Sequence, residues 1–255
     1  MLAKTRQDYI QKALRAHGAV TVAELVEQFG VSAETVRRDL LAMEQAGVLH
    51  RVHGGAMTAN AMMPYRSLEN RLKDRNDQKD ALCRAAAETV EDGDYIAIGT
   101  GSTPVHFARI LVKKVSKLTV VTYSLQVLQT LRENPGIEIL LVGGRFDPDE
   151  ETFSGQLALD MLQRLHVEKS YVFPSAVSLE HGICSYEETL YPQQRALLHN
   201  CDQAYILADS SKFERKALYK VDDMRKEYIY ITDSQLPCQL RSIYEENGIQ
   251  VITGE

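Results

Sequence analysis

Arginine and histidine side chains gather in residues 31–56 of a chain that is acidic overall. Arg37 and Arg38 are adjacent in a segment with helical periodicity, and Arg51 and His53 follow in a stretch that alternates apolar and polar residues. A guanidinium group binds phosphate, and it can also pair with guanine through two hydrogen bonds in the DNA major groove. Two arginines alone leave two interpretations open, a solvated helix face or a surface for an anionic polymer.

The distribution of charge restricts where such a polymer could bind. The 255-residue chain has a formal net charge of −6, but residues 1–57 contain seven Lys and Arg against six Asp and Glu. Binding to a polyanion is therefore expected only in the N-terminal part. Because phosphate neutralisation dominates affinity for DNA, this nearly neutral module should bind weakly alone, and we expect a homo-oligomer, either a dimer or a tetramer.

Three short helical segments and the alternating stretch form an ordered series in this part of the chain. The second segment begins at the capping-box pair Thr21 and Glu24 and ends at Gly30, and the third begins at Ser32. The break between them is about three residues, the length of a helix-turn-helix corner. The alternating stretch suits a β-wing. This order favours DNA binding and predicts a winged helix-turn-helix domain over residues 1–57.

The third helix is expected to present its arginines on the outer face. With Val36 at the centre of the buried face, Arg38 lies roughly 200° away and Arg37 lies on the flank. We expect Arg38 to pair with guanine and Arg37 to bind a backbone phosphate, while the wing holds the neighbouring backbone or minor groove. The residues expected to bind double-stranded DNA are Ser32, Glu34, Thr35, Arg37, Arg38, Arg51 and His53.

The pattern of apolar and polar residues is different in the rest of the chain. Residues 58–78 are polar and are expected to form a linker, leading into a helix at residues 64–90. Beyond it, apolar runs alternate with helical segments; the runs are DYIAIGT, KLTVVTYS, IEILLVGG, KSYVFPSA, QAYILADS, EYIYITDS and IQVITGE. This alternation predicts a Rossmann-like α/β domain over residues 79–255, with a largely parallel sheet covered by helices on both faces.

The first of these strands runs into a turn rich in glycine and hydroxyl groups. The turn consists of Gly99, Thr100, Gly101, Ser102 and Thr103. Exposed backbone N–H groups at a helix N-terminus would cradle a phosphate without a metal ion. The turn lacks the lysine of a Walker sequence and does not match GxGxxG. On these residues alone, a tight strand-to-helix turn with no ligand remains the alternative.

Other strand ends add candidates, because open α/β sheets bind ligands at their carboxyl edge. They are Tyr123 and Ser124, Gly143 and Gly144, Glu187 and Glu188, and Lys212. Each alone is more often structural: paired glycines form turns, glutamates at a helix start are solvated, and lysines lie on the surface. Their shared position after strands favours a common site.

Two features that the sequence lacks indicate the cellular compartment in which we expect the protein. No run approaches the ~18 consecutive apolar residues of a membrane span, and the start of the chain indicates an amphipathic helix, so we expect a cytoplasmic protein. The four cysteines form no CxxC pair, which favours free thiols in a reduced compartment and no zinc site.

The segment VSAETVRRDLLAMEQAGVLHRVHGGA resembles the N-terminal signature of DeoR-family bacterial transcriptional regulators, through its TxRRDL core and its terminal HGGA. The resemblance covers nearly the whole chain. It implies a repressor of carbohydrate-catabolism genes that binds operator DNA and is released by a phosphorylated sugar, although some relatives need the effector in order to bind DNA. It also implies a second domain similar in fold to ribose-5-phosphate isomerase.

The resemblance extends to the effector site and has two departures. The GTGST turn matches the family's phosphate loop, and Glu188 and Lys212 fall in its EE and DxSKF elements. The family often has Asp at the position of Gly99 and Asn-Asn at residues 123–124, so the identity of the sugar stays open. The residues expected to bind the effector are Gly99, Thr100, Gly101, Ser102, Thr103, Tyr123, Ser124, Gly143, Gly144, Glu188 and Lys212.

A second interpretation makes the large domain an active sugar-phosphate isomerase with a DNA-binding appendage. Such chemistry needs a general base beside the sugar C1–C2 unit and a group that stabilises the enediolate, roles that Glu188 and Lys212 could take. The departures at Gly99 and Tyr123 remove polar groups from that site, and a fused helix-turn-helix gives catalysis no evident purpose. We therefore expect a regulator that is not an enzyme and that needs no cofactor.

Overall fold

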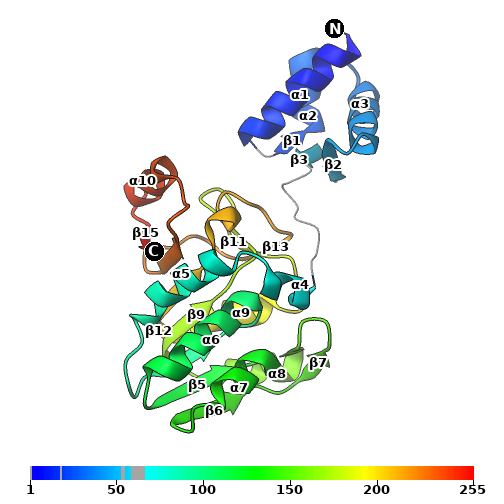
Figure 1. The fold of residues 1–255 in the computed structure, drawn as a ribbon. Coiled ribbons are helices and arrows are strands. Elements are labelled where there is room, and N and C mark those ends of the chain that lie inside the picture. The colour runs from blue at the N-terminus through cyan, green and yellow to red at the C-terminus, as the bar shows by residue number, and fades with distance from the viewer. Residues whose placement is uncertain (1, 18, 53–54, 59–66) are drawn as a thin grey trace. The chain divides into compact units, whose positions relative to one another are not determined.

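The computed structural model describes residues 2–17, 19–52, 55–58 and 67–255 (Figure 1). The chain divides into two compact units, Met1–Tyr65 and Arg66–Glu255. This division falls within the stretch expected to be a linker, residues 58–78, because helices α4 and α5 begin there and belong to the second unit.

In its described residues, the N-terminal unit has three helices and a small antiparallel sheet. The elements are α1 (Ala3–His17), β1 (Ala19–Thr21), α2 (Val22–Phe29), α3 (Ala33–Gln45), β2 (Leu49–Val52) and β3 (Gly55–Thr58), with the strand order β1-β3-β2. The corner between α2 and α3 contains Gly30, whose φ of 64° is in the left-handed region that favours glycine. The β2–β3 hairpin is the expected wing, so the winged helix-turn-helix is confirmed.

One apolar cluster holds this unit together. Ile10 of α1, Leu25 of α2, Val36 and Leu40 of α3, and Leu49 of β2 are all buried in it. Val36 and Leu40 are four residues apart and therefore share one face of α3, while the opposite face stays in solvent. The spacing of apolar residues along the sequence thus determines which side of α3 is outermost.

The larger unit is built on a seven-stranded parallel sheet. Its strands are β4 (Tyr95–Ile98), β5 (Leu118–Thr122), β6 (Ile137–Leu141), β9 (Val167–Val172), β12 (Cys201–Leu207), β14 (Ile229–Asp233) and β15 (Gln250–Gly254), in the order β15-β14-β12-β9-β4-β5-β6. They correspond to the apolar runs expected to be strands. Strand order reverses between β4 and β9, and such a switch point opens a crevice at the carboxyl edge of the sheet.

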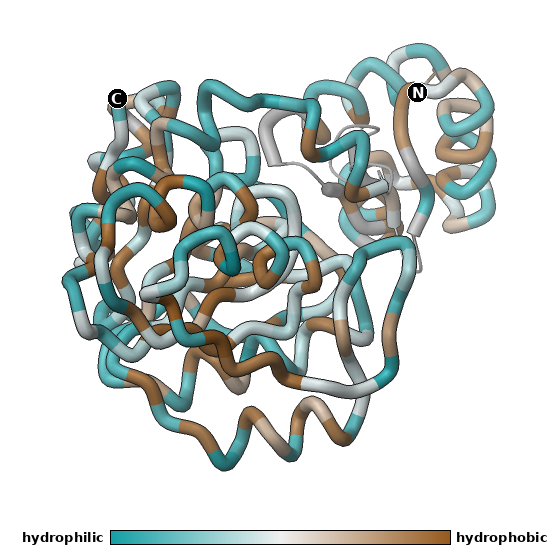
Figure 2. Tube along the Cα trace, turned by 60° about the horizontal axis from the view of Figure 1, so that its bottom comes forward, coloured by the Kyte–Doolittle hydropathy of each residue, from teal (hydrophilic) through white to brown (hydrophobic). Residues whose placement is uncertain are grey.

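Helices cover both faces of this sheet, as the alternation of strands and helices predicts. Side chains of α5 (Asn76–Ala87), α6 (Ser102–Lys114) and α7 (Leu125–Leu131) pack on one face. Those of α8 (Gln156–Leu162), α9 (Tyr191–His199) and α10 (Cys238–Glu246) pack on the other. Figure 2 shows hydrophobic and hydrophilic stretches alternating along the helices, which is the pattern of helices with one buried side.

Two small β structures in the larger unit were not expected. One is the hairpin of β7 (Arg145–Asp147) and β8 (Thr152–Ser154). The other is the antiparallel sheet of β10 (Ala176–Ser178), β11 (Gly182–Ser185) and β13 (Tyr219–Asp222). Strands this short give too little alternation to be recognised in a sequence.

The single helix expected over residues 64–90 is wrong for the part that the structure describes. Two helices occur there, α4 (Leu68–Lys73) and α5, separated by Asp74 in an extended conformation and Arg75 with a left-handed φ of 52°. Ser67 caps α4 by accepting a hydrogen bond from the Asn70 N–H at 3.4 Å. The break separates α5 from α4, the helix that carries Arg71 of the site described below.

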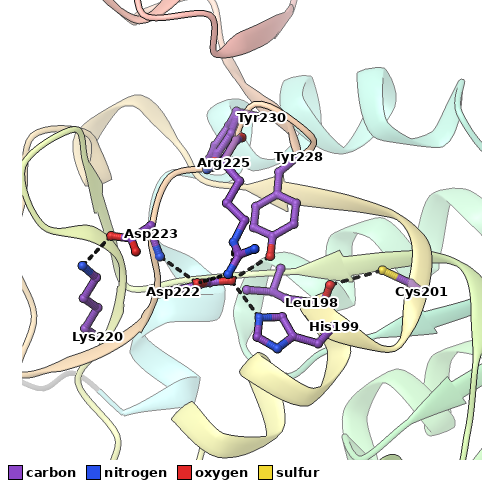
Figure 3. Close-up of polar contacts among 9 residues, drawn as sticks. All are labelled: Leu198, His199, Cys201, Lys220, Asp222, Asp223, Arg225, Tyr228 and Tyr230. Carbon is purple, nitrogen blue, oxygen red and sulfur yellow. Dashed lines mark hydrogen bonds and ion pairs between the residues drawn. The ribbon is translucent and has the colours of Figure 1, made fainter.

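A polar cluster around Asp222 ties α9 to the small antiparallel sheet (Figure 3). The Asp222 carboxylate accepts hydrogen bonds from the Tyr228 hydroxyl at 2.7 Å and from the Arg225 guanidinium at 3.1 Å, and lies 2.8 Å from His199 Nε2. Burial opposes ionisation, but these hydrogen bonds outweigh it and hold the pKa of Asp222 below its ordinary value.

None of the described helices is long and apolar enough to cross a membrane.

Candidate functional site

The outer face of α3 carries the arginine pair in solvent. Ser32 caps this helix, since its side chain accepts a hydrogen bond from the Thr35 N–H at 3.3 Å and the two hydroxyl oxygens are 3.0 Å apart. Arg37 is exposed and lies 3.9 Å from the Glu34 carboxylate. Arg38 is also exposed and forms no ion pair with any residue that the structure describes. The face therefore offers one uncommitted guanidinium and one that is weakly paired.

A buried ion pair beneath this face was not predicted. Asp39 lies beside the two arginines in sequence but is buried, and the Arg6 guanidinium of α1 donates to its two carboxylate oxygens at 2.6 and 3.1 Å. This pair fastens α3 to α1 and thereby orients Arg38. The signal was present in the sequence, because Asp39 is three residues after Val36 and so falls on the apolar face.

The wing lies against the end of α3. Arg51 of β2 is exposed, its backbone N–H donates to Glu44 Oε1 at 2.8 Å, and its guanidinium is 3.8 Å from the same carboxylate. Arg51 thus stays available at the surface while β2 is positioned by α3. His53, also expected to bind DNA, lies outside the described residues.

In the larger unit, the GTGST turn is a buried loop between β4 and α6. Thr100, Ser102 and Thr103 are buried, and Gly101 precedes α6 with a φ of 121° that L side chains rarely adopt. The Thr100 hydroxyl has no hydrogen-bond partner among the described residues. A buried hydroxyl without a partner at the N-terminus of a 13-residue helix is suited to an anionic ligand.

Three cationic side chains, Arg71, Lys79 and Lys212, interact electrostatically with one another near this loop. Arg71 of α4 has its Nη1 atom 3.6 Å from the point where a Cβ of Gly101 would lie. Lys79 of α5 is buried and donates to the backbone carbonyls of Arg71 and Asp74. Lys212, at the end of the short helix η1 (Ser210–Lys212), is half-buried and donates to the Pro174 carbonyl at 2.9 Å.

The pKa values of both lysines reflect this crowding. Burial, and next the charge of Lys212, lower the pKa of Lys79 to about 8. Burial also lowers the pKa of Lys212, although the carboxylate of Asp209 opposes the shift. Each lysine thus carries its charge at a cost that a bound anion would reduce.

Two carboxylates lie next to the cations. Glu150, in the turn between β7 and β8, is buried and forms an ion pair with the Arg71 guanidinium. Burial, and next the charge of Glu150, raise the pKa of the half-buried Glu187. Glu188 is exposed and interacts instead with Tyr219, whose pKa burial and Glu188 raise. The structure thus brings Glu187, rather than the expected Glu188, toward Arg71.

The other expected effector residues have mixed surroundings. The Tyr123 hydroxyl is buried without a partner among the described residues, 3.4 Å from the position that a Cβ of Gly99 would take. Ser124 caps α7 by accepting a hydrogen bond from Val127 N–H at 3.4 Å. A Cβ at Gly144 would lie 2.5 Å from the Ser154 carbonyl oxygen, so close packing accounts for that glycine. Gly143 is exposed.

Arg71 and Lys79 were missed because both fall in or beside the expected linker. The sequence did contain a signal for Lys79. It precedes Leu82, Cys83 and Ala86 at spacings of three, four and seven residues, so it belongs to the buried face of α5. A lysine on such a face needs an explanation, and the site supplies one.

The fold defines a class of protein, a winged helix-turn-helix unit joined to an α/β unit with a glycine-rich loop at the start of α6. Residues 6–61 match the DeoR-like helix-turn-helix domain, and residues 74–234 match the DeoR C terminal sensor domain. The chain belongs to the DeoR family, whose members are transcriptional regulators.

Relatives of similar length support this assignment. The lactose phosphotransferase system repressor of Lactococcus lactis subsp. lactis is 32% identical over 92% of this chain and 93% of its own. The transcriptional repressor GlcR of Bacillus subtilis is 28% identical over 95% of this chain and 93% of its own.

Among solved structures, ribose 5-phosphate isomerase A from Methanocaldococcus jannaschii aligns over 55% of each chain with 17% identity and a TM-score of 0.40.

Proposed function

We propose that the protein is a repressor of a carbohydrate-catabolism operon, which binds operator DNA through α3 and is released when a phosphorylated sugar binds at the GTGST loop. One observation carries the sensor half of this proposal. Arg71 lies beside Gly101 at the N-terminus of α6, Lys79 and Lys212 interact electrostatically with Arg71, and the buried Thr100 hydroxyl of the same loop has no partner among the described residues. A phosphate ester bound there would form charge-assisted hydrogen bonds with cationic groups that are otherwise partly removed from water.

The DNA-binding half rests on α3 and the wing. Arg38 projects into solvent from a helix whose opposite face is buried, which is the geometry that recognition in the major groove requires. Arg37 and Arg51 flank it and would hold backbone phosphates. A single unit with so little net charge should bind weakly, so we propose that two or four copies bind together at paired half-sites.

The sensor half is tested by thermal unfolding with a panel of phosphorylated sugars, each paired with its unphosphorylated sugar. An effector at 100 times its Kd should stabilise the protein by about 2.7 kcal/mol, and the parent sugar should have no effect. The same ester should then reduce binding to an operator selected from genomic fragments. Equal stabilisation by a sugar and its ester would contradict a phosphate site.

We also propose that the larger unit senses sugar phosphates without converting them. Glu188 is exposed beside Tyr219, whereas Lys212 donates to the Pro174 carbonyl, so the two groups that the isomerase interpretation needs have separate partners. Incubation with ribose 5-phosphate and related esters, followed by product analysis, should show no turnover. Measurable isomerisation would favour the enzyme.

A further inference from the structure

The ion pair between Glu150 and Arg71 places an acidic side chain of the protein inside the cationic site. The Glu150 side chain is only 5% exposed, and that of Arg71 is 32% exposed. The backbone places Glu150 independently of Arg71, because the Glu150 N–H donates to Asp147 Oδ1 at 3.3 Å and the next residue, Glu151, accepts from the Leu125 N–H at 2.9 Å. The carboxylate is therefore held in place by the β7–β8 turn.

The Arg71 guanidinium lies between a carboxylate and the proposed phosphate loop. Its Nη2 atom contacts Glu150, and its Nη1 atom lies beside Gly101 in the proposed phosphate loop. A guanidinium binds carboxylate and phosphate with the same planar pair of donors, so the two anions compete for it. A phosphate dianion in the loop would also lie near Glu150 and Glu187, and like charges at such distances repel.

We propose that Glu150 competes with the phosphate group of the ligand for Arg71 and thereby weakens the affinity of this site for phosphate. In the effector-free protein Glu150 takes the place of the ligand's anion on Arg71, and phosphate binding displaces it. Displacing a buried carboxylate from its guanidinium costs free energy, and the ligand's own interactions must exceed that cost. This inference rests on the proposed effector site.

The same exchange would move α4. The Arg71 side chain is a partner in the exchange, and the Arg71 carbonyl accepts from Lys79, so two residues of the site hold this helix. In sequence, α4 is the first described element after β3, and residues 59–66 join the two. A change of partner at Arg71 therefore acts on the helix nearest in sequence to the DNA-binding unit.

Isothermal titration of the full-length protein with inorganic phosphate tests the inference. Glu150→Gln keeps the size of the side chain and removes its charge, so affinity for inorganic phosphate should rise about tenfold. Asp149→Asn is the matched control, since Asp149 is exposed in the same turn, and it should leave affinity unchanged. Adding Arg71→Gln to Glu150→Gln should abolish the gain. Melting temperatures establish that each variant is folded.

Each outcome of these titrations either supports or contradicts the proposed role of Glu150. An unchanged or lower phosphate affinity in Glu150→Gln, or a gain that persists without Arg71, would overturn the role of Glu150. The proposed function fails separately, if no phosphorylated sugar stabilises the wild-type protein. Wild-type binding of esters together with an unchanged Glu150→Gln would therefore leave the effector site standing and remove only this inference.

Discussion

The α3 surface and the GTGST site both present cations to an anion, but in opposite surroundings. The Arg37 side chain is 64% exposed, and Arg38 beside it is also in solvent. In the GTGST site, Lys79 is buried and Lys212 half-buried, and burial lowers the pKa of each. One surface keeps its cations hydrated, and the other removes them from water.

The difference corresponds to the size of the ligand that each region is proposed to bind. A DNA duplex can only be met by exposed side chains, and each exposed contact is weakened by salt and water. A small ester can be enclosed, and in an enclosed site each charge interacts more strongly. The cost of enclosure is that the empty site must satisfy its cations internally, and Glu150 does so for Arg71.

The largest effect is expected from Lys79→Met, which removes a buried cation of the enclosed site. Affinity for the sugar phosphate should fall about 100-fold, because a charged hydrogen bond in a desolvated site is lost. Operator binding should persist but no longer respond to the ester, as a gel-shift titration would show. Lys73→Met is the control, since Lys73 is exposed and pairs with Glu69 at 2.6 Å. A normal response in Lys79→Met would remove this residue from the site.

The two arginines of the exposed surface should differ in the kind of loss they cause. Arg38→Ala should reduce binding to the selected operator by about 1–3 kcal/mol for each copy and leave non-specific binding nearly unchanged. Arg37→Ala should weaken both equally and lower the slope of log affinity against log salt by about one. Fluorescence anisotropy with operator and scrambled duplexes measures both. Full discrimination by Arg38→Ala would assign base recognition to another residue.

A smaller effect, on pH dependence, should separate the two regions. Lys79 loses its proton as pH rises through about 8, and a bound anion favours the protonated form. Sugar-phosphate affinity should therefore fall by up to about tenfold per pH unit above that value. Operator binding depends on arginines and should not change between pH 7 and about 9. Titrations at constant ionic strength would show this, and parallel pH profiles for the two ligands would contradict the assignment.

The smallest effect on either ligand is expected from Asp222→Asn, because its cluster belongs to neither region. The hydrogen bonds from Tyr228, His199 and Arg225 stabilise the ionised form, so the variant should lose about 2 kcal/mol of stability at neutral pH. In the wild type this contribution is present above about pH 4 and is lost as pH falls toward the lowered pKa. Denaturant unfolding measures both. A change in ligand affinity would mean that the cluster is coupled to the site.

The exposed region could be predicted almost completely from the sequence. Its apolar spacing identified the buried face of α3, and the opposite face then followed from the helical period. The ion pair of Asp39 was not predicted, because its partner Arg6 is 33 residues away. The enclosed site was predicted in part: the loop was found from its glycines, but Arg71, Lys79 and Glu150 were not.

The sequence by itself determined the two units, the alternation of strands and helices along the chain and the loop at the end of β4, because these depend on local periodicity and on turn residues. The tertiary structure decided which side chains meet at that loop. Arg71, Glu150 and Lys212 lie far apart in the sequence, and no local pattern relates them. They come together because parallel strands bring distant chain segments to one edge of the sheet, where the electrostatic partner of a charge is chosen by distance in space.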